Sequence, residues 1–186
     1  AFLAVQVTFY ILIAFVVAYG ASPALGLNLS RETMLTGVLI GAVVMVPAIF
    51  VSGALSDRYG RRGIFMAGAI LLGLWGFVLF PLIDTKSLLW ISVAVAVGQI
   101  LVAMMYGPQA AFLAEMFSTR VRYSGASLGY QLGAIIGGAV APLLATSLLA
   151  KFGSSLAISI YIAIACAITT VSVILLSETY QADMHE

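Results

Sequence analysis

Residues 53–62 read GALSDRYGRR, and this short polar link decides how the sequence on either side of it folds. Its four charged side chains separate two runs, 33–56 and 63–83, that contain no charged residue. Each run is at least as long as the ~20 residues that an α-helix needs to cross the hydrocarbon core of a bilayer. The stretch therefore predicts a tight, charged turn at a membrane surface, with a membrane-spanning helix on each side.

The same alternation of apolar run and charged link continues through the chain. The charge-free runs cover 1–30, 33–56, 63–83, 87–114, 123–150 and 152–177. Only 8% of the 186 residues are charged and 63% are hydrophobic, whereas soluble domains carry about 25% charged residues. No run alternates as a membrane β-strand would. We therefore expect an all-α membrane protein solvated by the lipid bilayer, a single bundle over 1–186, with helices near 3–24, 33–56, 62–83, 87–116, 123–150 and 154–177.

The distribution of basic residues predicts an orientation. Six crossings place both ends of the chain and the links 57–62 and 115–122 on one side. Those two links hold five arginines, and the other three links hold only Arg31, Lys86 and Lys151. Because basic residues gather in cytoplasmic loops, we expect both ends in the cytoplasm.

Composition excludes several classes of function. The net charge of +1 suggests no nucleic-acid partner. No metal-ligand cluster, nucleophile–base pair or phosphate-binding loop stands out, so we expect neither an enzyme nor a cofactor.

The single cysteine, Cys166, lies in an apolar run. The sequence starts at Ala1 rather than at methionine, which suggests a fragment.

Two motifs carry a family resemblance. The link GALSDRYGRR resembles the signature loop of the major facilitator superfamily. Residues 108–130, PQAAFLAEMFSTRVRYSGASLGY, resemble the end of helix ten and the start of helix eleven in the metabolite:proton symporter branch. That branch carries shikimate, dicarboxylates such as 2-oxoglutarate, proline or betaine. Its usual prolines are replaced here by Ala114 and Ser118.

The resemblance covers nearly the whole chain and implies an architecture. The chain would be the C-terminal half of a twelve-helix carrier, built as two inverted three-helix repeats in the cell inner membrane. It would take part in alternating-access symport of a small polar metabolite, an organic acid or osmolyte, with protons. Its partners would be the substrate, protons and a missing N-terminal six-helix half.

Under the resemblance, charged residues of two links form a cytoplasmic gating network. We expect Glu115 to pair with Arg61 or Arg122, and Asp57 to face a helix end or an arginine. Gly53 and Gly60 would allow close helix approach and a tight reversal. The proposed network comprises Asp57, Arg58, Arg61, Arg62, Glu115, Arg120 and Arg122.

A row of glycines predicts a smooth helix face. Gly125, Gly129, Gly133 and Gly137 recur every four residues, a spacing that lets membrane helices pack closely. The row either packs statically or lets the helix slide against the opposite half, and both readings stay open.

Polar residues inside apolar runs are candidates for a substrate cavity, because the family's first and fourth helices line it. Tyr10 and Tyr106 lie nearest mid-membrane, Gln99 is nearer the outside, and Gln109 and Gln131 are nearer the cytoplasm. Phenols and amides in an apolar wall can orient a carboxylate or zwitterion. The same residue types also anchor helices at interfaces or join neighbouring helices.

No Asp, Glu, Lys, Arg or His falls at mid-membrane in this sequence. Proton coupling normally needs an ionisable group in the pathway, so we expect that group to lie outside this chain. The alternatives are a sugar-uptake or drug-efflux carrier of the same superfamily, a membrane fragment or sensor that transports nothing, and a carrier assembled from two copies.

Overall fold

In the computed structural model, residues 2–23, 27–115 and 122–175 are described, and they form six helices long and apolar enough to cross a membrane. The expectation of an all-α membrane protein with six spans is confirmed. Four spans are single helices: α3 (Arg31–Tyr59), α4 (Arg61–Asp84), α5 (Leu88–Glu115) and α8 (Leu156–Leu175).

The first and fifth spans each contain a π-helical segment. The first consists of α1 (Leu3–Tyr10), η1 (Ile11–Phe15) and α2 (Val16–Ala21). The fifth consists of α6 (Arg122–Ala134), η3 (Ile135–Ala139) and α7 (Val140–Phe152). A π-helical turn inserts one extra residue into an α-helix and is frequent at functional sites.

Three helix ends differ from the sequence-based bounds for local reasons. The first span ends at Ala21, not near 24, because Ser22 is extended (ψ 121°) ahead of Pro23, as residues before proline generally are. Helix α3 begins earlier and ends later than expected. Ser30 caps it by accepting a hydrogen bond from the backbone N–H of Thr33 at 3.1 Å, and the helix continues to Tyr59 before Gly60.

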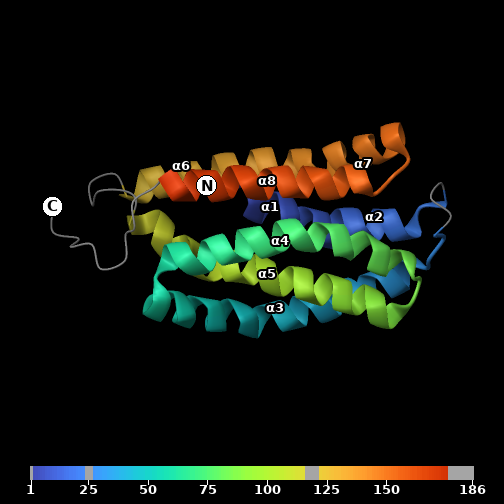
Figure 1. The fold of residues 1–186 in the computed structure, drawn as a ribbon, viewed down its shortest axis with the longest axis horizontal. Coiled ribbons are helices and arrows are strands. Elements are labelled where there is room, and N and C mark those ends of the chain that lie inside the picture. Colours follow the sequence, from blue (N-terminus) through green and yellow to red (C-terminus); the bar gives the residue numbers. More distant parts are fainter. Residues whose placement is uncertain (1, 24–26, 116–121, 176–186) are drawn as a thin grey trace.

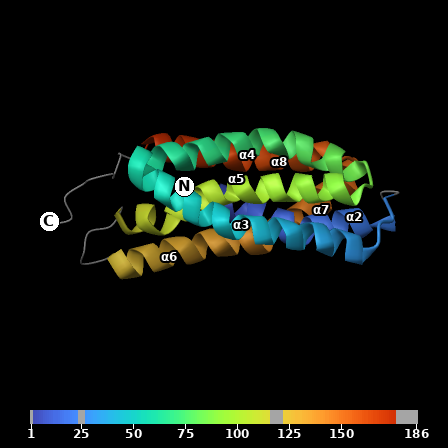
Figure 2. The ribbon, with the colours of Figure 1, turned by 90° about the horizontal axis from the view of Figure 1, so that it is seen from below.

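The six spans form an elongated bundle in which the first helix is enclosed. Figure 2 shows α4 and α8 along one side and α3 and α6 along the opposite side, and Figure 1 shows α1 between the edge that holds α6, α7 and α8 and the edge that holds α3. The first span is 61% buried, against 22% for α3 and 24% for the fifth span. Both α3 and the fifth span therefore leave most of their surface to lipid or to another protein segment.

Glycines set the distance between α3 and α5. A Cβ atom at Gly107 would lie 2.8 Å from the backbone nitrogen of Gly53 and 2.8 Å from the carbonyl oxygen of Ile49. Farther along, a Cβ atom at Gly41 would lie 2.8 Å from Val95 Cγ1. Small residues at these positions let the two helices touch backbone to backbone.

Hydrogen bonds between helices complete the bundle on its other side. The Ser159 hydroxyl on α8 donates to the carbonyl oxygen of Gly76 on α4 at 2.7 Å. The Thr169 hydroxyl on α8 accepts from the backbone N–H of Ala4 at 3.0 Å. This second bond satisfies an amide in the first turn of α1, which has no partner within its own helix.

Candidate functional site: an aromatic group and a charged link

Four aromatic side chains from three helices are grouped together. We name them the aromatic group: Phe9 and Tyr10 of α1, Tyr106 of α5, and Tyr130 of α6. The hydroxyls of Tyr106 and Tyr130 are 3.4 Å apart. The rings of Phe9 and Tyr106 stack with centroids 6.5 Å apart, and the Phe9 and Tyr10 rings meet edge to face at 5.6 Å.

The aromatic group is accessible from outside the six helices. The Tyr106 side chain is 36% exposed, and Phe9, Tyr10 and Tyr130 are half-buried. Sequence reasoning named Tyr10 and Tyr106 as cavity residues, but nothing in the sequence pointed to Phe9. A phenylalanine among apolar residues carries no signal until a neighbouring helix places a tyrosine over it.

The π-helical segment η3 makes room for the aromatic group. A Cβ atom at Gly138 would lie 2.7 Å from the ring of Tyr10, and one at Gly137 would lie 2.6 Å from Cβ of Gln6. Both glycines therefore let the first span lie directly on the fifth. The aromatic group consequently sits where an irregular helical turn meets an enclosed helix.

The glutamines named as cavity residues lie in different surroundings. Gln131 is exposed, whereas Gln99 is 0% and Gln109 3% exposed. Among the described residues, neither the oxygen nor the nitrogen of these two buried amides has a hydrogen-bond partner. Gln99 lies against α3, since a Cβ atom at Gly41 would be 3.3 Å from its Cγ. In this conformation Gln99 and Gln109 face the interior of the bundle, and their contact with substrate stays a prediction.

The charged link 57–62 joins α3 to α4 and reaches α8. The Arg61 guanidinium donates to the Asp57 carboxylate at 3.3 Å. Arg62 donates to the carbonyl oxygen of Ile174 at 2.8 Å, so it binds the last turn of α8, where a cation also offsets the partial negative charge of the helix end. Arg58 is exposed in the last turn of α3.

Part of the expected gating network lies outside the described residues. Arg120 falls there entirely, as do the side chains of Glu115 and Arg122. The expected pairing of Glu115 with Arg61 or Arg122 therefore stays a prediction. Asp57 pairs with Arg61, the first residue of α4, so it lies beside a helix N-terminus and an arginine at once.

The two glycines of the link, Gly53 and Gly60, have different structural roles. Gly60 has φ 91°, a value that side chains with a Cβ atom rarely adopt, and it reverses the chain between α3 and α4. Gly53 lies directly opposite Gly107 of α5.

Among Gly129, Gly133 and Gly137 of the glycine row, only Gly137 is closely packed. A Cβ atom at Gly129 would have no neighbour within 4 Å, and one at Gly133 would touch only Phe2 at 3.9 Å. Gly137 is the member in close contact with another helix. The face at Gly129 and Gly133 is thus smooth and open within this chain.

Comparison with known proteins settles the family. A sequence model described as Major Facilitator Superfamily matches residues 1–184. The chain belongs to the major facilitator superfamily. It is therefore a multi-pass integral membrane protein of a transporter superfamily, not an enzyme. Within the described residues, no three His, Cys, Asp or Glu side chains are grouped so that they could hold a metal ion.

Curated relatives within the superfamily are named as metabolite carriers. The chain is 34% identical over 182 residues to the inner membrane metabolite transport protein YhjE of Escherichia coli K12, covering 95% of this chain and 40% of the relative. It is 30% identical to the E. coli K12 shikimate transporter, covering 94% and 40% of the two sequences. For the E. coli K12 proline/betaine transporter the identity is 26%, with coverage of 95% and 35%. The chain thus spans about two fifths of the length of the curated relatives it matches.

Proposed function

We propose that this chain is the C-terminal six-helix half of a carrier that moves a small polar metabolite, an organic acid or osmolyte, by alternating access. The observation that carries the proposal is the aromatic group, in which the Tyr106 and Tyr130 hydroxyls lie 3.4 Å apart beside the rings of Phe9 and Tyr10, all within charge-free runs of the sequence. The named substrates of the relatives, shikimate, proline and betaine, support this chemical class. Each of these substrates carries a carboxylate.

The substrate carboxylate would lie against the phenol hydroxyls of Tyr10, Tyr106 and Tyr130. Phenols can donate hydrogen bonds to a carboxylate, and the adjoining rings supply an apolar wall for the rest of a small substrate. Gln131 is exposed on the same helix as Tyr130. Gln99 and Gln109 are both buried, so they would join the site only in a conformation that exposes them.

Coupling to protons would come from outside this chain. In the described spans, the charged residues lie at the helix ends, at links such as 57–62 and 84–86. A proton pathway needs an ionisable group within the membrane. We infer that such a group, and any cation that neutralises the substrate carboxylate, belongs to a further six-helix half docked on the open faces of α3 and α6.

Uptake by the complete protein tests the substrate site. Labelled shikimate, 2-oxoglutarate, proline and betaine are the probes, each measured with and without a proton gradient. Tyr106→Phe removes one hydroxyl and keeps the ring stacked on Phe9, so we expect the KM of the transported probe to rise about fivefold, the effect of one hydrogen bond. Tyr59→Phe, at an exposed tyrosine in the link, is the matched control.

The possible outcomes test three points separately: the location of the substrate site, the substrate class and proton coupling. Unchanged KM in both variants would place the substrate elsewhere. Uptake of none of the four probes would remove the assigned substrate class. Equal uptake with and without a proton gradient would contradict proton coupling but not the proposed metabolite transport.

A further inference from the structure

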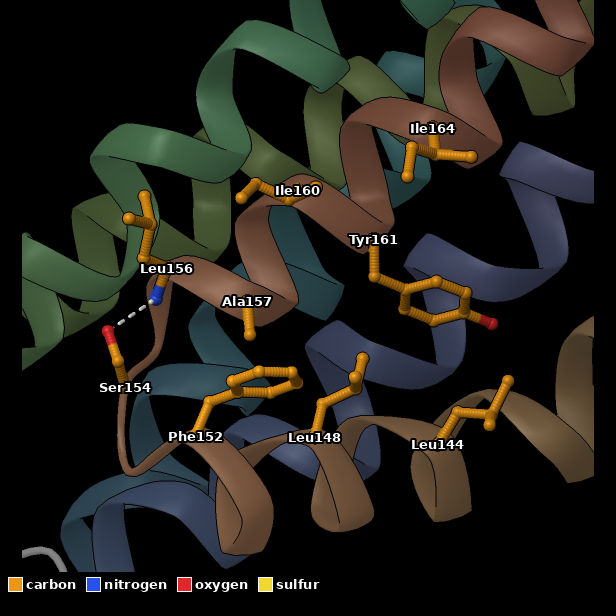
Figure 3. A pocket seen from close by; sticks show the side chains of 9 residues that line it. All are labelled: Leu144, Leu148, Phe152, Ser154, Leu156, Ala157, Ile160, Tyr161 and Ile164. Atoms are coloured by element: carbon orange, nitrogen blue, oxygen red, sulfur yellow. Dashed lines mark hydrogen bonds between the residues drawn. The ribbon is translucent and has the colours of Figure 1, made fainter.

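An apolar groove runs between α7 and α8 at the end of the bundle where the link 153–155 joins them (Figure 3). Its volume is about 630 Å³. Leu144, Leu148 and Phe152 line it from α7, and Ala157, Ile160 and Ile164 line it from α8. Figure 3 shows the labelled α7 side chains directed toward α8, and the small side chain of Ala157 on α8 facing α7.

The groove exists because α7 and α8 touch along only one edge at this end. Leu149 of α7 and Ile158 of α8 are buried, whereas Phe152 is 59% and Ile164 53% exposed. Gly153, with φ 62°, ends α7 and turns the chain into the short link. Ala157 is too small to fill the space that opens between the two helices.

The dimensions of the groove match one leaflet of a bilayer. It follows α7 from Leu144 to Phe152 and α8 from Leu156 to Ile164, about 12 Å along each helix. Half of a typical hydrocarbon core is about 15 Å. The protein spans a membrane, so an apolar groove beginning at a helix end and running this distance inward lies at the depth of lipid acyl chains.

The side chain of Lys151 places a positive charge beside Phe152, at the end of the groove. The ammonium nitrogen of Lys151 is 5.6 Å from the centroid of the Phe152 ring, which lines the groove. Among the residues that the structure describes, no carboxylate lies within ion-pair distance of Lys151. A lysine near the helix end can hold its charged group at the lipid headgroups while its stem follows the apolar surface.

We propose that the groove between α7 and α8 binds one acyl chain of an anionic phospholipid, with the lipid phosphate at Lys151. The acyl chain covers Leu148, Ala157 and Ile160, and the headgroup stays at the membrane surface. This assignment rests on the membrane embedding of the chain and not on its transport substrate. A lipid held here braces α7 against α8 just beyond the π-helical segment η3.

Photo-crosslinking of the complete protein tests the proposal. Benzoylphenylalanine replaces Leu148 inside the groove, or Leu143, which is 70% exposed and outside it, as the matched control. The protein is reconstituted into an equimolar mixture of phosphatidylglycerol and phosphatidylethanolamine with identical acyl chains. After illumination, mass spectrometry counts the adducts of each lipid.

At position 148 we expect phosphatidylglycerol adducts to exceed phosphatidylethanolamine adducts about fivefold, the bias that one lysine near the surface supplies. Position 143 should show a ratio near one. Lys151→Gln should return position 148 to a ratio near one, and Lys151→Arg should preserve the bias. Ala157→Phe should reduce lipid adducts at 148 without changing those at 143, which also shows that the variants are folded.

Two results would overturn the proposal. Adducts at position 148 to another protein segment, whether a second copy or the remainder of the carrier, would mean that protein covers the groove. Equal adducts of the two lipids at position 148 with Lys151 intact would mean that no anionic headgroup is selected there.

Discussion

At the scale of single residues, Gly60 is the position where one Cβ atom matters most. Its φ of 91° is a conformation that costs a residue with a side chain about 1–3 kcal/mol. We expect Gly60→Ala to lower the unfolding temperature of the purified protein in detergent. Gly63→Ala is the control, because a Cβ atom there meets nothing within 4 Å and alanine favours helix. Equal unfolding temperatures for the two variants would contradict this account.

A substitution at Asp57 distinguishes a stabilising role of the charged link from a role in switching between conformational states. Its carboxylate is 66% exposed and pairs with Arg61 at 3.3 Å, so the pair contributes less than about 1 kcal/mol. We expect Asp57→Asn to leave the unfolding temperature nearly unchanged but to shift the balance between inward- and outward-facing states and slow transport. A switch needs a gap of only a few kcal/mol between its states.

The control for Asp57→Asn is Glu32→Gln, which removes an exposed carboxylate at the opposite end of α3. Accessibility of engineered cysteines on each side of the membrane measures the balance of states, and uptake measures the rate. The gating hypothesis fails if Asp57→Asn, alone and together with Glu115→Gln, leaves both quantities at the level of the unaltered protein.

At the scale of helices, the contact of α3 with α5 depends on backbone approach. A Cβ atom at Gly107 would collide with backbone atoms of Gly53 and Ile49 at 2.8 Å, and backbone cannot move aside as a flexible side chain can. Overpacking of this kind typically costs about 1–3 kcal/mol. We therefore expect Gly107→Ala to lower the unfolding temperature, again with Gly63→Ala as control. An unchanged unfolding temperature for Gly107→Ala would contradict this backbone contact between α3 and α5.

The helices also show where hydropathy patterns stop being informative. The long apolar runs predicted six spans, because about 20 apolar residues can only cross a bilayer as a helix. The same runs contain no signal for the π-helical segments η1 and η3. Only the structure shows that glycines lie where these segments meet their neighbours: Gly98 of α5 lies against Leu12 of η1, and Gly137 and Gly138 of η3 lie against Gln6 and Tyr10.

At the scale of the whole molecule, orientation in the membrane is open to a direct test. We expect Thr85→Cys, in the link between α4 and α5, to react with a membrane-impermeant maleimide in intact cells. Tyr59→Cys, exposed beside the charged link, should react only after the membrane is disrupted. Both variants are made in a Cys166→Ala background. The reverse labelling pattern would place both ends of the chain outside the cytoplasm.

The low burial of α3 and of the fifth span has a consequence at the same scale. Gly129 and Gly133 are open within this chain, and Tyr130 of the aromatic group lies on the same helix, α6, and is half-buried. The proposed second half would cover this face and close the cavity around the substrate. Partial length relative to the curated relatives agrees with that arrangement.

The sequence by itself determined that this is a six-span membrane protein with its charges at the helix ends, because hydrocarbon excludes charge and requires long helices. The signature link also predicted the superfamily. Only the tertiary structure decided that Gln99 and Gln109 are buried while Tyr106 is accessible, and that Gly137 packs closely while Gly129 does not. The reason is that lipid tails and a protein interior are equally apolar. Hydropathy therefore shows which residues lie within the membrane, but not which helix face meets a neighbour, a lipid or the transport cavity.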